Sequence, residues 1–470
     1  MFGKEKSRHN ACSFCVVEVF ALFLTACFWN GIIIIEIIFC RCVFQRGSVC
    51  MSDVGKLSVP LNVDSFVEAV SNYYYVDKTL LIKEVLDDGA LVSLFLRPGG
   101  FGKSLNMDML RVFFERAEED TSIYFENTKI WQENEIYRKH QGNHPVIFLN
   151  FSDVWEDSWK AVYSRLCSII SYEFARHGAE LAPFLDEYDE RFLSEIVSGR
   201  ASKIRFTGSL LWLSRKLFEV YGERTVIIVD DYDVPFEVAY RFGFYDELSD
   251  FLGGFFSAGL KDNSSLAFGF LTGTLRAFKG SVFSGLNNIV VYSLLDKRYA
   301  EYFGFTADEV ATMADYYGDG DRLSEIRQWY GGYRCGGIEL YSAGSLVNYF
   351  LDRTFFPYRT YYISDLPELE VALCSDIDAL QKLKDLLNGK TMSFFIDTDF
   401  VYTEINKRSD YLFFLLMMSG YLACRNVKLT SWGNFLGELF VVNKENDMLL
   451  KRFIFSVLQK KLEVDKADKI

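Results

Sequence analysis

Short apolar runs alternate with amphipathic segments along the chain from about residue 73 onward. Each run has the length of a strand and little polar interruption, which is typical of a strand buried on both faces. The segments between the runs carry apolar residues at helical spacing; Leu105, Met109, Val112 and Phe113, for example, fall on one face. Strands of this kind separated by helices indicate a parallel sheet with helices on both faces. The expected strands are 91–96, 145–151, 225–230 and 266–273.

Helices are expected between these strands and also in the C-terminal part of the chain. One helix is expected between Asp77, near its start, and Gly89, just beyond its end. After about residue 300 the strand-like runs give way to helical patterns. The sequence therefore predicts an α/β domain over 60–300 and a mostly helical C-terminal region over 301–470. The other clear helical segments are 155–174, 210–221, 305–317 and 342–352.

The first 50 residues form a separate segment that is hydrophobic and rich in cysteine. Residues 19–35 carry no charge and are bracketed by Glu18 and Glu36, but a bilayer span needs roughly 20 apolar residues. Three interpretations stay open: a membrane anchor through 19–35, a secretory signal, or a start site set too early. We favour the early start site over the anchor, because composition typical of a soluble protein begins at Met51.

The net charge of the chain and the positions of its cysteines and histidines disfavour several classes of function. The chain has a net charge of -14 and no block of lysines and arginines, so broad binding to nucleic acid is not expected. Four of the ten cysteines lie far apart beyond the N-terminal segment, which suits a reducing, cytoplasmic compartment better than a disulfide framework. Cys12 and Cys15 lack a second pair at zinc-binding spacing. None of the four histidines stands near a candidate nucleophile, which disfavours a catalytic triad or a zinc hydrolase.

The stretch RPGGFGKS, Arg97–Ser104, lies between an expected strand and an expected helix. A loop that binds a nucleoside triphosphate needs backbone N–H groups that converge on a phosphate, a lysine, and a hydroxyl for Mg²⁺. Lys103 and Ser104 supply the last two. Arg97 stands where the first glycine is usual, at a position that makes few phosphate contacts. The alternative is a glycine-rich turn whose lysine faces water. The glycines expected at the phosphates are Gly99, Gly100 and Gly102.

Acidic and hydroxyl side chains end two later strands. Asp230 follows four apolar residues and is expected to hold Mg²⁺ together with Ser104. Asp231, next in the chain, is expected to polarise the attacking water, although glutamate is commoner in that role. Thr272 ends the strand expected beside that of Asp230 and is a candidate contact to the γ-phosphate. Arg276 either stabilises the charge that develops during phosphoryl transfer or neutralises a carboxylate in the core.

Seven motifs carry a resemblance to a known family: YYYVDKTLLIKEVL, RPGGFGKSLNMDML, VIIVDDYDVP, LTGTLRAFKGSVFSGLNN, FGFTADEV, WYGGY and MMSGYLAC. In this order they resemble the AAA-ATPase-like family of predicted P-loop ATPases, which is related to STAND-type signal-transduction ATPases. The resemblance covers about residues 60–430. It implies an ASCE-type ATPase core in which Lys103, Ser104, Asp230 and Arg276 fall on nucleotide-site positions.

Three departures from the family pattern bear on the activity. The family loop usually reads Arg-Pro-Arg-Arg-Phe-Gly-Lys, so Arg97 is in pattern while Gly99 and Gly100 replace basic residues. Asp231 stands where the family usually has glutamate, which bears on the hydrolysis rate more than on binding. Many members continue into a C-terminal nuclease domain of the PD-(D/E)XK type. The tail after Asn443 predicts one helix and a charged end, so we expect that domain to be absent or truncated.

The sequence therefore predicts a P-loop NTPase fold that binds ATP and Mg²⁺. We expect slow ATP hydrolysis and a conformational switch that acts on an unidentified protein partner. The ATPase domain is expected in the cytoplasm, with membrane attachment only if 19–35 is an anchor. The alternatives are an ATP-binding scaffold with little turnover, a P-loop kinase, and the remnant partner of a nuclease system. A kinase would carry an arginine-rich lid, and no such run occurs.

Overall fold

The computed structural model divides the chain into two units, Met1–Asp53 and Val54–Ile470. In the first unit, the described residues form strands β1 (Ala26–Trp29) and β2 (Ile32–Ile35), which pair in antiparallel fashion. No described helix is long and apolar enough to cross a membrane. The rest of the expected anchor 19–35, like Cys12 and Cys15, lies outside the described residues. In the second unit, residues 55–277, 288–359, 373, 376–398, 400 and 410–467 are described.

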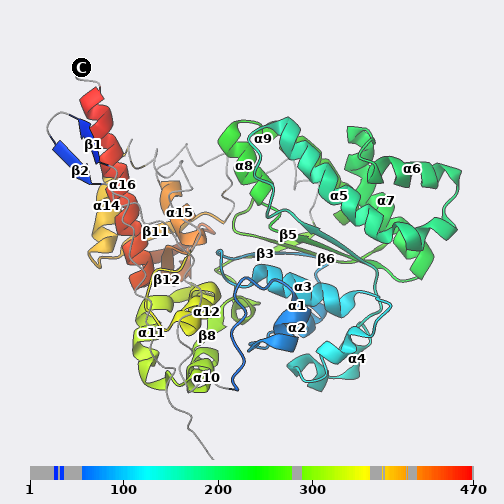
Figure 1. Ribbon diagram of the computed structural model, residues 1–470, viewed down its shortest axis with the longest axis horizontal. Helices are drawn as coiled ribbons and strands as arrows, with labels where there is room; N and C mark the ends of the chain where they lie inside the picture. Colours follow the sequence, from blue (N-terminus) through cyan, green and yellow to red (C-terminus); the bar gives the residue numbers. More distant parts are fainter. Residues whose placement is uncertain are drawn as a thin grey trace, which may run out of the picture. The chain divides into compact units, whose positions relative to one another are not determined.

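The second unit contains a five-stranded parallel sheet with the strand order β4-β5-β6-β3-β7 (Figure 1). Neighbouring strands are in register at their carboxyl ends, with Asn150 opposite Asp230 and Leu96 opposite Gly273. These ends therefore share one edge of the sheet, where open parallel sheets bind their ligands. The strands are β3 (Val92–Leu96), β4 (Val146–Asn150), β5 (Thr225–Asp230), β6 (Leu266–Gly273) and β7 (Ile289–Tyr292).

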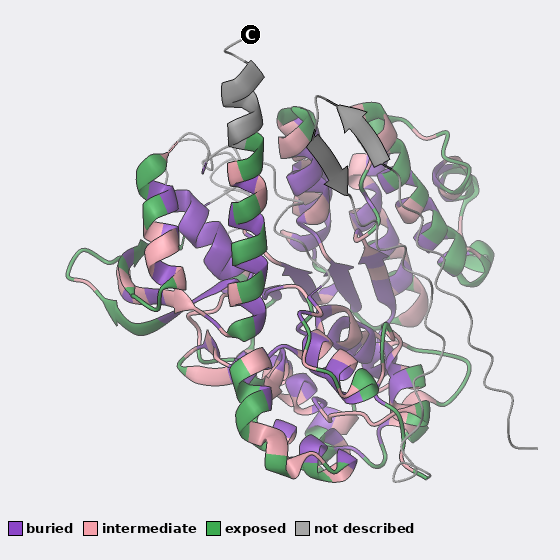
Figure 2. Ribbon diagram, turned by 60° about the vertical axis from the view of Figure 1, so that its left-hand side comes forward, coloured by how far each residue is buried: buried purple, intermediate pink, exposed green. Residues whose placement is uncertain are grey.

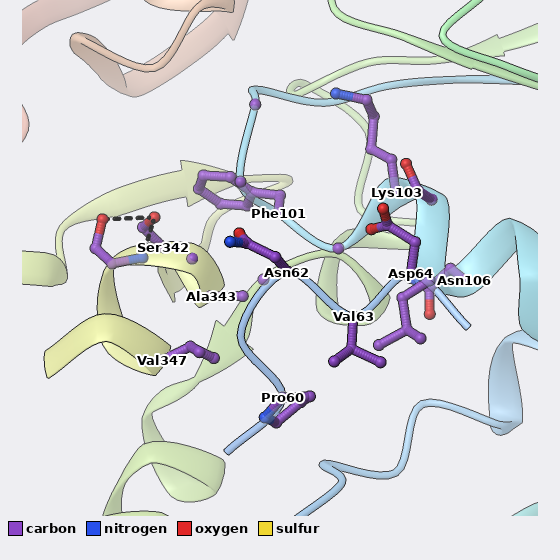
Figure 3. A pocket seen from close by; sticks show the side chains of 18 of the residues that line it. Pro60, Asn62, Val63, Asp64, Phe101, Lys103, Asn106, Ser342, Ala343 and Val347 are labelled. Atoms are coloured by element: carbon purple, nitrogen blue, oxygen red, sulfur yellow. Dashed lines mark hydrogen bonds between the residues drawn. The ribbon is translucent and has the colours of Figure 1, made fainter. Parts of the chain in front are cut away.

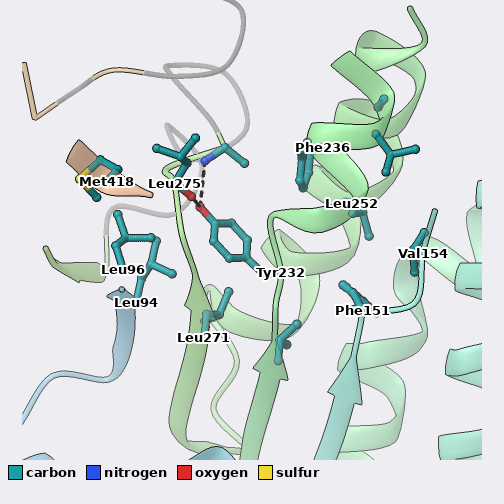
Figure 4. Close-up of a cluster of buried hydrophobic side chains, with 14 of the residues drawn as sticks. Leu94, Leu96, Phe151, Val154, Tyr232, Phe236, Leu252, Leu271, Leu275 and Met418 are labelled. Atoms are coloured by element: carbon teal, nitrogen blue, oxygen red, sulfur yellow. Dashed lines mark hydrogen bonds between the residues drawn. The ribbon is translucent and has the colours of Figure 1, made fainter. Parts of the chain in front are cut away.

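Helices cover both faces of this sheet. Successive side chains of a strand point to opposite faces, and since the side chains on both faces are apolar, each face packs against a layer of helices. Ile227 and Val229 pack in one apolar cluster with α5, α7 and α9, whereas Val226 and Ile228 pack in another with α1, α2 and α3. Figure 2 shows the strands buried between the helices, and Figure 4 shows part of the first cluster. The helices are α1 (Phe66–Asn72), α2 (Leu80–Asp88), α3 (Lys103–Phe114), α4 (Glu135–Arg138), α5 (Trp159–Leu181), α6 (Glu187–Val197), α7 (Lys203–Tyr221), α8 (Val234–Phe242) and α9 (Tyr245–Leu260).

The predicted α/β fold is confirmed, and its strands lie where the apolar runs predicted them. β5 and β6 match the runs 225–230 and 266–273 at both ends. The strand β7 was missed, because it has only four residues and one of them, Val290, is exposed. Such a short edge strand lacks the continuous buried run that marks the others.

The C-terminal region combines helices with two small antiparallel sheets that the sequence pattern did not predict. Their strand orders are β8-β10-β9 and β11-β13-β12. The domain boundary near residue 300 stays a prediction. The strands are β8 (Phe305–Thr306), β9 (Tyr333–Cys335), β10 (Ile338–Tyr341), β11 (Met392–Ile396), β12 (Leu422–Leu429) and β13 (Phe435–Val441). The helices are α10 (Ala307–Tyr317), α11 (Leu323–Tyr330), α12 (Ala343–Asp352), α14 (Ile377–Leu387), α15 (Asp410–Met418) and α16 (Lys444–Ala467).

Candidate functional site

A glycine loop, residues 97–102, connects β3 to α3 at the carboxyl edge of the sheet. Gly100 and Gly102 have φ values of 78° and 75°, a region that glycine enters without steric penalty. Gly102 is the N-cap of α3 and offers no side chain to its first turn. The N–H groups of that turn are therefore open to an anion, which the positive end of the helix also attracts.

Lys103 is the first residue of α3 and is only 8% exposed. Its Nζ lies 3.4 Å from the carbonyl oxygen of Arg97 and 3.7 Å from Oδ1 of Asp231. The lysine therefore stands between the glycine loop and the acids that end β5. An ammonium held in this position can pair with a phosphate oxygen without large rearrangement.

Asp230 ends β5 as a fully buried carboxylate. Thr272 donates its hydroxyl to Oδ1 of Asp230, and Asn150 donates its side-chain amide to Oδ2 at 3.4 Å. Burial and the neighbouring charge of Asp231 raise the pKa of Asp230 to about 6, although hydrogen bonds from Thr272 and Ser104 and the charge of Lys103 oppose this rise. A divalent cation beside this carboxylate would favour its ionised form.

Asp231 adopts a left-handed backbone conformation with φ of 48°. Such a conformation is uncommon outside glycine, and aspartate and asparagine tolerate it better than most residues. The N–H of Asp231 donates to the Thr272 hydroxyl at 3.3 Å, so one threonine contacts both consecutive acids. The turn leaves the Asp231 side chain 22% exposed at the cleft, while Asp230 stays buried behind it.

Asp233 is a third acid that the sequence analysis did not select. Its Oδ2 accepts the N–H groups of Thr274 and Leu275, each at 2.8 Å, so it fixes the turn that follows β6. Burial raises the pKa of Asp233 to about 6. The sequence could have indicated Asp233, because it stands two residues after Asp231 in the motif VIIVDDYDVP.

A cleft of about 520 Å³ opens over these groups. Figure 3 shows Lys103 and Asp64 at one end of it and Ser342, Ala343 and Val347 at the other. Burial, together with the charges of Asp231 and Asp108, raises the pKa of Asp64. Neither Asp64 nor the start of α12 was selected from the sequence, since each lies far along the chain from the glycine loop.

The structure brings most of the predicted site residues together. Thr272 and Asp230 are fully buried and joined by the hydrogen bond between their side chains, and neither is among the described residues that line the cleft. Arg276 is placed elsewhere: it lines a separate cavity of about 280 Å³ together with Leu96 and Phe414, and it is not among the described residues that line the cleft. The predicted residues that line the cleft are Gly99, Gly100, Gly102, Lys103, Ser104 and Asp231.

Arg97, which replaces the expected first glycine, is fully buried and lines no part of the cleft that the structure describes. Its Nη1 donates to the carbonyl oxygens of Leu96, Tyr292 and Ser293 at 2.8, 2.9 and 3.0 Å. Its Nη2 donates to that of Tyr299 at 3.4 Å. Arg97 therefore connects the start of the glycine loop to the segment that follows β7 through hydrogen bonds. Its guanidinium does not line the cleft in which phosphates would bind.

The donor groups fit a magnesium ion bound together with a phosphate. In the part of the chain that the structure describes, no group of three or more His, Cys, Asp or Glu side chains could hold a metal. Mg²⁺ commonly takes only one or two protein ligands and completes its shell with phosphate oxygens and water. Ser104 and Asp230, which share a hydrogen bond, are a hydroxyl and a carboxylate of the required kind.

One family model matches the segment that contains the glycine loop and the acids that follow β5. Residues 60–283 match a family model described as Predicted AAA-ATPase. Over these residues, the predicted AAA-ATPase segment, the chain is similar to that family. This similarity supports an ATP-binding ATPase, with a nucleotide and typically Mg²⁺ as ligands. The predicted AAA-ATPase segment contains the glycine loop and all the site residues predicted from the sequence.

A relative shares this similarity without revealing a function. The chain is 28% identical over 309 residues to a protein of Azotobacter chroococcum mcd 1 described as an uncharacterized protein in the vnfD 5' region. The alignment covers 65% of this chain and 54% of that protein, so the chain spans about half of that relative's length. The alignment is longer than the predicted AAA-ATPase segment, so the similarity extends beyond it.

Proposed function

We propose that the chain binds ATP with Mg²⁺ in the cleft, hydrolyses it slowly and changes conformation with its nucleotide state. One observation carries the proposal. Lys103, at the uncapped start of α3, lies 3.7 Å from an acid at the carboxyl edge of a parallel sheet. A helix start, a lysine and a strand-end acid in this relation suit a triphosphate and its metal.

Each residue takes a defined part in the proposed complex. The N–H groups of Gly99, Gly100 and Gly102 bind the phosphates, and Lys103 pairs with their outer oxygens. Ser104 and Asp230 hold Mg²⁺, which neutralises phosphate charge when bound. Thr272 fixes Asp230 through its hydroxyl and fixes Asp231 through the backbone N–H.

Hydrolysis requires a group that orients water toward the outermost phosphate. Asp231 is the partly exposed acid of the cleft and is our candidate. Its side chain is one methylene shorter than glutamate, which supports slow turnover. Arg276 can stabilise the transferring phosphate only if it reaches the cleft in the nucleotide-bound state, because it lines another cavity here.

A route from the cleft to the C-terminal region supports the proposed switch. The N–H of Gly344, in the first turn of α12, donates to the carbonyl oxygen of Gly100 in the glycine loop at 2.9 Å. In the same turn, the Ser345 hydroxyl donates to Glu445 at 2.9 Å, and Glu445 lies in the first turn of α16. A shift of the loop on phosphate binding would therefore act on two C-terminal helices.

The test is ATP binding by the Lys103→Met variant. Methionine keeps an apolar stem of similar length and removes the ammonium, so we expect a loss of at least about 100-fold in ATP affinity with Mg²⁺ present. Lys160→Met is the matched control, because Lys160 is exposed on α5, away from the cleft. Unchanged affinity in a folded Lys103→Met protein would refute the site. An ATP-binding wild type without phosphate release would favour the scaffold alternative.

A further inference from the structure

A second cavity, of about 580 Å³, borders the glycine loop. Arg97 and Pro98 line this cavity but not the cleft, whereas Phe101 lines both. Further walls come from the segment around β9 and from β12, and each of these strands is at the edge of its small antiparallel sheet. Its volume falls in the range of roughly 300–1,000 Å³ that is usual for small-molecule sites.

The charged side chains that line this cavity are all positive. They are Arg97, Arg334 and Arg425, and no Asp or Glu is among the described residues that line it. This composition is unusual for a chain with 64 acidic and 50 basic residues. A cluster of one sign in a partly enclosed cavity concentrates ions of the opposite sign.

Arg97 is the buried member of this cluster. Its guanidinium contacts backbone carbonyls, and within the described residues no carboxylate forms an ion pair with it. Its Nε is buried and has no hydrogen-bond partner. Burial disfavours this cation more than the nearby charge of Asp296 favours it, and an anion in the cavity would add a counter-charge.

The two other arginines retain capacity for a ligand. Arg334 pairs with Glu339 at 3.4 Å and Arg425 pairs with Glu438 at 3.3 Å, and neither acid lines the cavity. A guanidinium has five N–H donors arranged in a planar fork. One carboxylate partner therefore leaves donors that a second carboxylate or a phosphate can use.

The remaining walls are mainly apolar. They include side chains from the segment after β7, from β10, from α15, from β12 and from the start of β13, which would contact the body of a ligand. These residues are Leu294, Leu295, Leu340, Met417, Leu422, Val427 and Phe435. An inorganic ion would leave these side chains without contact, so the lining favours an organic ligand.

We propose that this cavity is a second ligand site, which takes a small organic anion with a carboxylate or phosphate group on an apolar body. The anionic group would lie among Arg97, Arg334 and Arg425. The nucleotide is not the expected occupant, because the glycines proposed for its phosphates, together with Lys103 and Asp231, line the cleft and not this cavity. The proposal does not depend on ATP hydrolysis.

Calorimetric titration of the full chain with 4-phenylbutyrate tests the proposal, with the neutral amide 4-phenylbutyramide as the matched ligand. We expect the acid to bind at least about tenfold more tightly than the amide. The Arg334→Gln/Arg425→Gln protein is expected to lose this preference. Arg97 is kept in that variant because it holds the glycine loop. Arg191→Gln is the control for a change of charge, since the Arg191 side chain is 75% exposed and lines neither cavity.

The Lys103→Met variant separates the two sites. Acid binding that persists in this variant while ATP binding is lost supports the second site. Phenyl phosphate, titrated in the same variant, shows whether the cavity prefers phosphate or carboxylate. Equal affinities for acid and amide, or an unchanged preference in the double variant, would overturn the proposal. Loss of acid binding in Lys103→Met would overturn it too, by placing the acid in the cleft.

Discussion

Gly344 donates its backbone N–H to the carbonyl oxygen of Gly100 at 2.9 Å, and this bond joins the C-terminal region to the glycine loop. The two residues are far apart in the sequence, and no side chain is needed for the bond. Gly100 has a positive φ and lies where phosphate N–H donors are expected. If phosphate binding rotates the peptide group that follows Gly100, the Gly100 carbonyl oxygen moves. The hydrogen bond that it accepts from Gly344 in α12 would then change as well.

The first prediction concerns how this change reaches α16. Glu445 is fully buried and accepts the Ser345 hydroxyl and the N–H groups of Tyr358 and Arg359. Glu445→Gln keeps the shape but loses the charge and one acceptor oxygen, so α12 and α16 should uncouple. Hydrogen exchange with and without ATP should show protection of α12 in both proteins, and protection of the start of α16 in the wild type alone.

Glu325→Gln is the control for this prediction, because the Glu325 side chain is half exposed on α11. It should respond to ATP as the wild type does. ATP affinity should stay within about threefold in both variants, since Glu445 does not line the cleft. An α16 that responds equally to ATP in Glu445→Gln would contradict the proposed route.

The second prediction addresses the acid that orients water. Asp231→Asn keeps the size of the side chain and its tolerance of positive φ, but it removes the charge that polarises water. We expect phosphate release to fall by about 100-fold or more while ATP still binds. Asp231→Glu should match or exceed the wild-type rate because the longer acid reaches further. A wild-type rate in Asp231→Asn would assign the role to another group.

The third prediction follows from the raised pKa of Asp230. Its carboxyl has a pKa of about 6 because of burial and the charge of Asp231, so it is mostly protonated at about pH 5 and mostly ionised at about pH 7. Mg²⁺ needs the ionised form. The gain in ATP affinity on adding Mg²⁺, measured against EDTA, should therefore be roughly tenfold smaller at the lower pH.

Asp230→Asn supplies the control for that pH dependence. It should show no gain with Mg²⁺ at either pH. The ligand-free variant should also be more stable than the wild type above about pH 6. The reason is that a raised acid pKa makes stability fall as pH rises from about 4 to about 6, and asparagine does not ionise. A melting-temperature gap that does not shrink toward acid pH would contradict the raised pKa.

The fourth prediction is that Arg97 stabilises the fold at the loop. Arg97→Met removes the donors to the carbonyl oxygens of Leu96, Tyr292 and Ser293. We expect the free energy of unfolding to fall by about 3 kcal/mol, measured by urea denaturation. Arg191→Met on the exposed face of α6 should stay within about 0.5 kcal/mol of the wild type. Equal stability of the two variants would show that water replaces the lost donors.

Local patterns in the sequence were sufficient to predict the sheet core and to select several residues that line the candidate cleft. The strand β5 is six buried residues ending in an acid, so its position and the role proposed for Asp230 follow from one short run. The first turn of α12 and Asp64 could not be found in this way, because only the folded chain brings them to the glycine loop. Arg276 shows a second limit of sequence patterns. It lies close to the end of β6 in the sequence, but in the structure it lines another cavity and not the cleft.

The last prediction concerns Gly273, the final residue of β6. It lies next to the start of the glycine loop and next to the turn of residues 231–233 that follows β5, which we call the acidic turn. Its carbonyl oxygen accepts the N–H of Arg97 at 2.9 Å. A Cβ at Gly273 would lie 2.5 Å from Oδ1 of Asp233 and 2.8 Å from Cε1 of Tyr232. Neither side chain can move freely, because Asp233 accepts two backbone N–H groups and the Tyr232 hydroxyl donates to the carbonyl of Leu275 (Figure 4).

Gly273→Ala should therefore displace the acidic turn and the start of the glycine loop together. We expect it to lower the free energy of unfolding by roughly 1–3 kcal/mol, as for an overpacked core, and to weaken ATP binding. Gly208→Ala is the matched control: it lies within α7 with nothing within 4 Å of the added methyl group, so it should stabilise the protein by about 0.5–1 kcal/mol. Urea denaturation and ATP titration of both variants measure the difference. If Gly273→Ala is as stable as Gly208→Ala, the acidic turn is not held rigidly by Asp233, and the site must tolerate movement at β6.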